Sequence, residues 1–147
     1  MADVSGLGVD GVARIGLMFL DGDALEKAVI DGVGQVDYEF EYFNQVKAVV
    51  SKIEKIAPGL GLTAVVWQIK PENNRLMSPM VAGNSLPREG HAYAEINEKA
   101  RAAFDGSFGE VLVRGGVSSH YYPIRNSDCD IIGALELIAG ARDANDI

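Results

Sequence analysis

The chain contains a single cysteine, Cys129, among its 147 residues. One cysteine excludes an intrachain disulfide and a cluster of thiolate metal ligands. The two histidines, His91 and His120, have no neighbouring cysteine and no partner histidine or glutamate at metal-ligand spacing. This pattern favours neither a zinc site nor a haem pair. We therefore expect no bound metal and no cofactor.

Basic residues are scarce as well, with 13 Lys and Arg against 21 Asp and Glu and a net charge of -8. A nucleic-acid partner is not expected, because phosphate binding needs clustered Lys and Arg, and an anionic membrane surface would repel the chain. No apolar run approaches the length that spans a bilayer, and residues 1–6 lack the basic and apolar segments of a signal peptide. The sequence as it stands predicts a soluble acidic domain.

Motifs for catalysis are also missing. Gly6-Leu7-Gly8 precedes a helical pattern instead of closing a strand-to-helix phosphate loop. No nucleophile elbow indicates a Ser/His/Asp arrangement. We therefore expect that the protein is not an enzyme.

Apolar residues are abundant, at 48% of the chain. A chain of this length and composition buries one core and is too short for two comfortable domains. We predict one domain over residues 1–147, with its core in residues 10–140 and a polar tail or linker stub at 141–147.

The N-terminal third predicts helices. Apolar residues at roughly helical spacing indicate two short helices between residues 12 and 33, broken at residues 21–23, with Asp23 capping the second. A long amphipathic helix is predicted over residues 36–57, where Pro58-Gly59 ends it.

The remaining chain predicts mainly strands, because its runs are β-branched and aromatic. Between the second and third strands, residues 93–104 predict a helix that Asp105-Gly106 stops. The expected fold is α+β: a five-stranded antiparallel sheet with the long helix on one face and the connecting loop and helix on the other. The five predicted strands are residues 62–69, 76–82, 108–114, 118–124 and 131–138.

Five stretches and their order along the chain carry a family resemblance. They are the helical lead-in, the strand Ala64 to Ile69 with its Trp67, the connection Leu86-Pro87-Arg88-Glu89-Gly90-His91-Ala92-Tyr93, the segment Ala102-Ala103-Phe104-Asp105-Gly106, and the hairpin from Tyr121-Tyr122-Pro123-Ile124 to Leu137. Together they resemble a single-Cache domain, the PAS-like extracellular sensor of bacterial methyl-accepting chemotaxis proteins and sensor kinases. The resemblance covers most of residues 10–140.

The resemblance implies a pocket between the sheet and the loop and helix that join the second and third strands. Small metabolites such as carboxylates or amino acids would bind there and shift the last strand and the terminal helices. It further implies a periplasmic or extracellular segment whose flanking transmembrane helices are absent from this chain. A homodimer is compatible with the sequence.

Five candidate ligand contacts follow from residue chemistry. Arg75 and Arg114 are cations suited to a ligand carboxylate, although a solvated surface arginine is the ordinary alternative. Trp67 would form an aromatic wall of the pocket or else belong to the core. His91 and Tyr93 lie in the connection that would cover the pocket, and both side chains can hydrogen-bond a small ligand.

A sixth candidate is one of two adjacent tyrosines. Tyr121 and Tyr122 point to opposite faces of their strand, so one of them at most lines a given pocket. We choose Tyr121, because it shares its face with Ser119, whose small side chain leaves room for a ligand.

Two alternatives remain open from the sequence. One is a naturally cytosolic GAF or PAS-like regulatory domain, which could hold a larger cofactor. The other is a small enzyme on an α+β sheet that uses His91 or His120 as its base.

Overall fold

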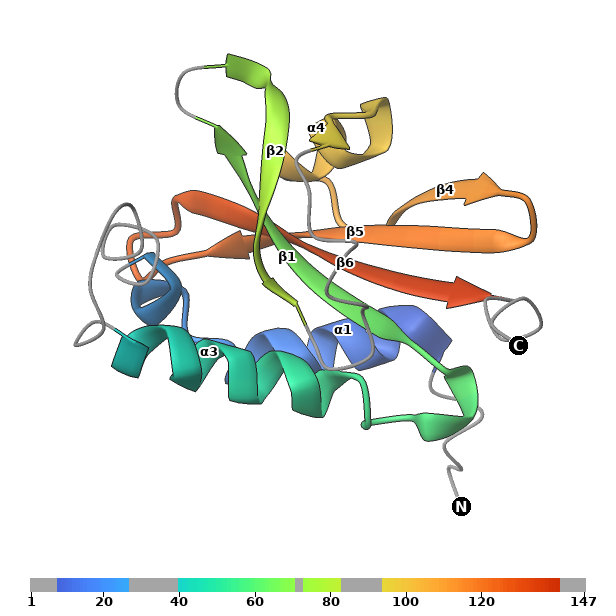
Figure 1. Cartoon of the computed structure of the whole chain (residues 1–147), viewed down its shortest axis with the longest axis horizontal. Helices are drawn as coiled ribbons and strands as arrows, with labels where there is room; N and C mark the ends of the chain where they lie inside the picture. The colour runs from blue at the N-terminus through green and yellow to red at the C-terminus, as the bar shows by residue number, and fades with distance from the viewer. Residues whose placement is uncertain (1–7, 27–39, 71–72, 83–93, 141–147) are drawn as a thin grey trace.

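The structure, a computed structural model, describes residues 8–26, 40–70, 73–82 and 94–140. Within these ranges, six strands form one antiparallel sheet in the order β3-β2-β1-β6-β5-β4 (Figure 1). The strands are β1 (Thr63–Lys70), β2 (Asn73–Ala82), β3 (Ala94–Glu95), β4 (Glu110–Arg114), β5 (Val117–Arg125) and β6 (Ile131–Gly140). The helices are α1 (Gly8–Phe19), α3 (Phe40–Ile53) and α4 (Glu98–Phe104), with a short 3-10 turn at Pro58–Leu60 and further helical residues at 22–26.

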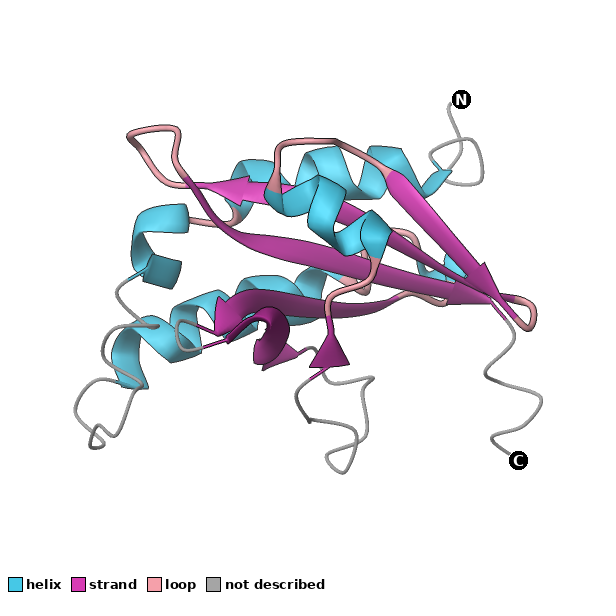
Figure 2. Cartoon of the chain, turned by 90° about the horizontal axis from the view of Figure 1, so that it is seen from above, coloured by secondary structure: helices cyan, strands magenta, loops and turns pink. Residues whose placement is uncertain are grey.

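The helices lie on both faces of the sheet. Helices α1 and α3 pack side by side against one face, and α4 packs against β4, β5 and β6 on the other (Figure 1). Seen from above, α4 lies over part of the sheet and the strands extend past it (Figure 2). The face that carries α4 is therefore covered over only part of its length by the described residues.

The alternation of side chains along the inner strands explains why both faces are buried. In β1, Ala64 and Val66 belong to the apolar cluster beneath α1 and α3, whereas Val65 and Trp67 belong to a second cluster beneath α4. Strands β5 and β6 divide their residues between the same two clusters. The inner strands are therefore apolar at nearly every position, because each face of the sheet has a core of its own.

The sheet has six strands instead of the five predicted, and α4 is shorter than the helix predicted over residues 93–104. Residues 94–95, expected to be helical, pair with β2 as β3, and the Ile96 amide donates to the Arg75 carbonyl over 2.8 Å. Asn97 then caps α4 by accepting from the Ala100 amide over 2.8 Å. Residues 94–95 gain backbone hydrogen bonds by pairing with the open edge of β2, and the Asn97 cap starts the helix only after them. The local helix propensity of Ala94 therefore does not decide its conformation.

Strand β2 runs through Pro79 without a break. Proline cannot donate to a ladder, and the pairing with β1 shifts register between Val66 and Trp67, opposite Pro79. A bulge of this kind accommodates proline inside a sheet.

Two helix boundaries also differ from the prediction. Asp21, not Asp23, caps the helical residues 22–26, because its Oδ1 accepts from the amides of Asp23 and Ala24. Helix α3 ends at Ile53 instead of residue 57, since the chain tightens into i-to-i-3 bonds ahead of Pro58. The predicted start of that helix, residues 36–39, lies outside the described residues.

A buried carboxylate joins this turn to the sheet. Glu54, just past α3, accepts from the Ala64 amide through Oε2 over 2.8 Å. The bond satisfies a buried backbone donor and fixes the start of β1 against the end of α3.

Candidate functional site

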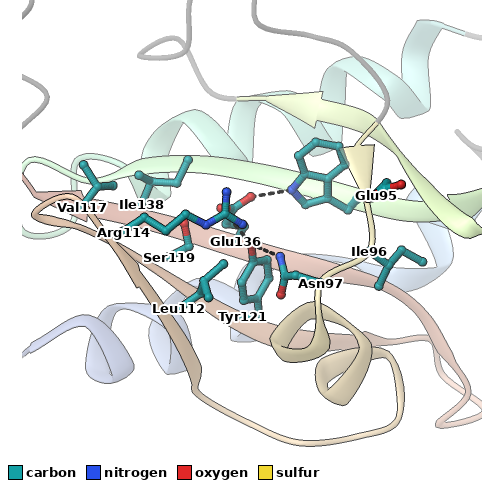
Figure 3. Close-up of a pocket in the computed structure, with 11 residues that line it drawn as sticks. Glu95, Ile96, Asn97, Leu112, Arg114, Val117, Ser119, Tyr121, Glu136 and Ile138 are labelled. Atoms are coloured by element: carbon teal, nitrogen blue, oxygen red, sulfur yellow. Dashed lines mark hydrogen bonds between the residues drawn. The ribbon is translucent and has the colours of Figure 1, made fainter.

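A cavity of about 560 Å³ lies on the face of the sheet that carries α4 (Figure 3). Strands β1, β4, β5 and β6 and the segment before α4 contribute its walls. Its described lining comprises Trp67, Glu95, Ile96, Asn97, Leu112, Arg114, Val117, Ser119, Tyr121, Glu136 and Ile138. Its volume falls within the range typical of small-molecule sites.

The carboxylate of Glu136 is the polar centre of the cavity. Its Oε1 accepts from the Trp67 indole nitrogen over 2.7 Å, and its Oε2 accepts from the Tyr121 hydroxyl over 3.3 Å. Glu136 is 7% exposed, and β6 places it beside both partners, opposite Tyr121 in the β5–β6 register. The indole and the hydroxyl are both neutral donors, so the carboxylate receives hydrogen bonds from them but no compensating positive charge.

Asn97 connects this centre to α4. Its Nδ2 donates to the Tyr121 hydroxyl over 3.1 Å, while its Oδ1 holds the Ala100 amide at the start of the helix. A chain of hydrogen bonds therefore runs from Trp67 through Glu136, Tyr121 and Asn97 to the first turn of α4. A ligand that binds any of these groups acts on the position of α4.

The environment of Tyr121 keeps its hydroxyl protonated. Burial, followed by the negative charge of Glu136, raises the pKa of Tyr121 to about 12. The hydroxyl thus serves as a donor to Glu136 and an acceptor from Asn97 throughout the physiological range.

Arg114 supplies the positive charge on the cavity wall. It is exposed, ends β4 and precedes the Gly115-Gly116 turn, and its side chain extends over the cavity toward Glu136 (Figure 3). Among the residues that the structure describes, it has no ion-pair partner. Its guanidinium is therefore available to solvent or to a ligand.

The rest of the cavity wall is largely aliphatic. Leu112 of β4, Val117 of β5 and Ile138 of β6 form one side (Figure 3). The cavity thus combines a polar centre with an apolar surface on which the carbon skeleton of a small ligand would pack.

The six residues chosen from the sequence have different outcomes. Trp67, Arg114 and Tyr121 line the cavity. Arg75 is exposed on β2 and is not part of the described lining. His91 and Tyr93 lie outside the described residues.

Sequence reasoning missed Glu136 and Asn97. The available signal for Glu136 was a lone charged residue inside the apolar run of the last strand. Asn97 could have been recognised as a helix cap, but its bond to Tyr121 depends on the tertiary fold.

The neighbouring Tyr122 lies on the opposite face, against α1. Its hydroxyl donates to Asp10 Oδ1 over 2.7 Å, and burial, followed by this bond, raises the pKa of Tyr122. Phe108 meets its ring edge-on with centroids 4.8 Å apart, and the Arg14 guanidinium lies 4.6 Å from the centroid of Phe108. These contacts attach α1 to β5 directly behind the cavity.

His120 shares this face with Tyr122 and not the cavity. Its Nε2 lies 2.9 Å from the Ser118 hydroxyl, and burial lowers its pKa despite the nearby charge of Asp10. Because neighbouring strand residues point to opposite faces, its imidazole is directed away from Ser119 on the cavity wall. It therefore cannot act as a base for that hydroxyl.

No grouping of His, Cys, Asp and Glu in the described ranges could hold a metal ion. The helices in those ranges are each too short or too polar to cross a bilayer.

No protein-family model and no curated protein matches this chain. Among solved structures, the GAF domain of A. aeolicus nlh2 in an inactive state aligns at 8% identity and a TM-score of 0.44, over 90% of this chain and 85% of that one. The sensory domain of the Campylobacter jejuni chemoreceptor Tlp3 with isoleucine bound aligns at 12% identity and a TM-score of 0.40, over 93% of this chain and 60% of that one.

Proposed function

We propose that this protein is a non-enzymatic, PAS-like sensory domain that binds a small organic solute in the cavity beside α4. The observation that carries the proposal is the cavity itself. It joins the buried Glu136 and its hydrogen-bonded partners to an aliphatic wall, which is the composition of small-molecule binding sites. Trp67, Arg114 and Tyr121 would contact the ligand together with Glu136 and Asn97.

A binding role fits these residues better than catalysis. Ser119 is a hydroxyl on the cavity wall, but its neighbour His120 is directed to the opposite face. The Tyr121 hydroxyl has a raised pKa and is a poor nucleophile at neutral pH. The hydrogen-bonded groups of the cavity are thus suited to holding a solute in place.

The path from the cavity to the rest of the molecule runs through adjacent residues of β5. Tyr121 belongs to the cavity, and Tyr122 is bonded to Asp10 of α1. A ligand that displaces β5 or β6 would therefore change the position of α1 on the sheet. Binding would favour the position of α1 in which the ligand is held more tightly. In the finer form of this proposal, the domain is the single-Cache, periplasmic part of a chemotaxis receptor, and α1 and the end of β6 lead to membrane helices.

The test is a thermal-shift screen of the purified chain against a broad metabolite library, followed by calorimetry of the hits. A ligand that binds only the folded state stabilises it by about 2.7 kcal/mol at a hundredfold excess over Kd. Ser119→Leu, which fills part of the cavity, should abolish the shift, whereas the matched control Ser127→Leu on the exposed hairpin should retain it.

Two results would refute the proposal. One is the absence of any stabilising compound in the library, and a hydrolase or transferase activity of the chain would then favour an enzyme instead. The other is a ligand that binds Ser119→Leu as tightly as the original chain, which would place its site outside this cavity.

A further inference from the structure

We propose that the cavity selects small aliphatic molecules that carry a protonated amine, and that Glu136 binds the ammonium group. This inference rests on the proposed function and narrows its ligand class. It differs from the sequence-based expectation, in which arginines bind a ligand carboxylate.

The hydrogen-bonding capacity of Glu136 is only partly filled. A carboxylate offers about four acceptor positions. The described structure fills one on each oxygen, from the Trp67 indole and the Tyr121 hydroxyl. A buried anion without a cationic partner is unfavourable, and a ligand ammonium would supply both the missing donors and the missing charge.

Arg114 is the one basic residue among the described residues that line the cavity. Arg114 extends toward Glu136 but forms no ion pair with it in the described structure (Figure 3). Its exposed side chain at the end of β4 is free to turn outward when a cation enters.

The charge of Glu136 also disfavours anions at the polar centre of the cavity. A carboxylate ligand that reached the polar centre would face Glu136, and two neighbouring carboxylates repel each other. The two neutral donors are already bonded to Glu136, so an anion would also have to displace those bonds.

The shape of the cavity points to an aliphatic body. Leu112, Val117 and Ile138 form an apolar wall, on which a short alkyl chain would pack. The Ser119 hydroxyl lies on the same lining and can accept a further ammonium N–H.

The experiment uses a panel of equal chain length and different charge on the intact chain: n-butylammonium, n-pentylammonium, butyrate, pentanoate, 1-butanol and 1-pentanol, measured by calorimetry and by thermal shift. The alkylammonium ions should bind, and the carboxylates of equal length should bind at least about tenfold more weakly. This comparison needs no variant, so it does not depend on how a substitution folds.

Substitutions then locate the interaction. Glu136→Gln should weaken alkylammonium binding roughly ten- to a hundredfold, because it removes the charge while preserving the size of the side chain. Trp67→Phe removes one neutral donor and leaves the carboxylate, so the ammonium preference should survive. Circular dichroism verifies that both variants are folded.

Different failures have different meanings. If the carboxylates or alcohols bind and the ammonium ions do not, or if Glu136→Gln binds ammonium unchanged, the inference is wrong while the sensory proposal stands. If no compound of the panel binds but the metabolite screen yields ligands without an amine, the inference is again wrong. If neither the panel nor the screen yields any ligand, both proposals fail.

Discussion

The two faces of the sheet bury similar strands for different purposes. The face beneath α1 and α3 is filled by a core of aliphatic side chains and Tyr122, whereas the face that carries α4 leaves a cavity with Glu136 at its centre. Among the described residues, each face also has one buried carboxylate near β1. Glu54 accepts from a backbone amide and fixes the chain, while Glu136 accepts from two side chains that themselves line the cavity.

This difference shows how one sheet can be both rigid and responsive. Aliphatic packing on the α1 and α3 face holds the strands in place. The other face concentrates its polar groups where a ligand could exchange hydrogen bonds with them. Strands β5 and β6 contribute side chains to both faces. Neighbouring residues on one of these strands therefore allow matched substitutions, one on each face.

The largest contrast is expected for Leu137→Ala and Ile138→Ala. Leu137 is 0% exposed on the face beneath α1 and α3, and its truncation should lower the free energy of unfolding by about 2–5 kcal/mol. Ile138 is only partly buried and borders the existing cavity, so its truncation should cost clearly less. Urea unfolding measures both. Equal losses would mean that the two faces are packed equally well.

The adjacent tyrosines give the next contrast. Tyr121→Phe and Tyr122→Phe each remove a hydroxyl bonded to a carboxylate and should each lower stability by roughly 1–3 kcal/mol. Calorimetry with a ligand from the screen should show a clearly larger loss of affinity for Tyr121→Phe, which contacts the ligand, than for Tyr122→Phe, which acts only through its bond to α1. If both variants lost the same affinity, the ligand site would not be confined to the cavity face.

A smaller effect is expected at alkaline pH. The pKa of Tyr121 is raised from 10.0 to about 12, so the folded state favours the protonated hydroxyl. The resulting stability is fully present below about pH 10 and is lost as the pH rises through about 12. Unfolding curves from pH 9 to 12 should show this loss for the original chain. A Tyr121→Phe variant with an equally steep decline would argue against the assignment.

The smallest effect concerns His120 at acidic pH. Its pKa is lowered from 6.5 because burial disfavours the charged ring, so the unfolded chain binds a proton more readily. Stability should therefore fall as the pH drops below about 6.5, and His120→Gln should reduce the slope. Ligand affinity, normalised for folding, should not follow this titration, because His120 lies behind the cavity. An affinity that changed as steeply with pH as the stability does would place the His120 ring at the ligand site, contrary to its position on the opposite face.

Local signals were sufficient for most elements of the fold. β-Branched and apolar runs in β1 and β6, bounded by glycine and polar turns, indicated strands of an antiparallel sheet. The assignment of Tyr121 and Tyr122 to opposite faces also needed nothing beyond the period of two. Asp21 and Asp23 show the limit of such signals, since both are good caps and only the backbone path distinguishes them.

Periodicity and turn chemistry over a few residues were enough to predict the α+β class, the antiparallel strands and the opposite faces of Tyr121 and Tyr122. Long-range pairing was needed to join Ala94–Glu95 to β2 and to bring Glu136 to Trp67 and Tyr121. Those contacts link residues up to 69 positions apart. A lone glutamate in an apolar strand acquires its role from whichever side chains the sheet register places beside it, and no local pattern specifies that register.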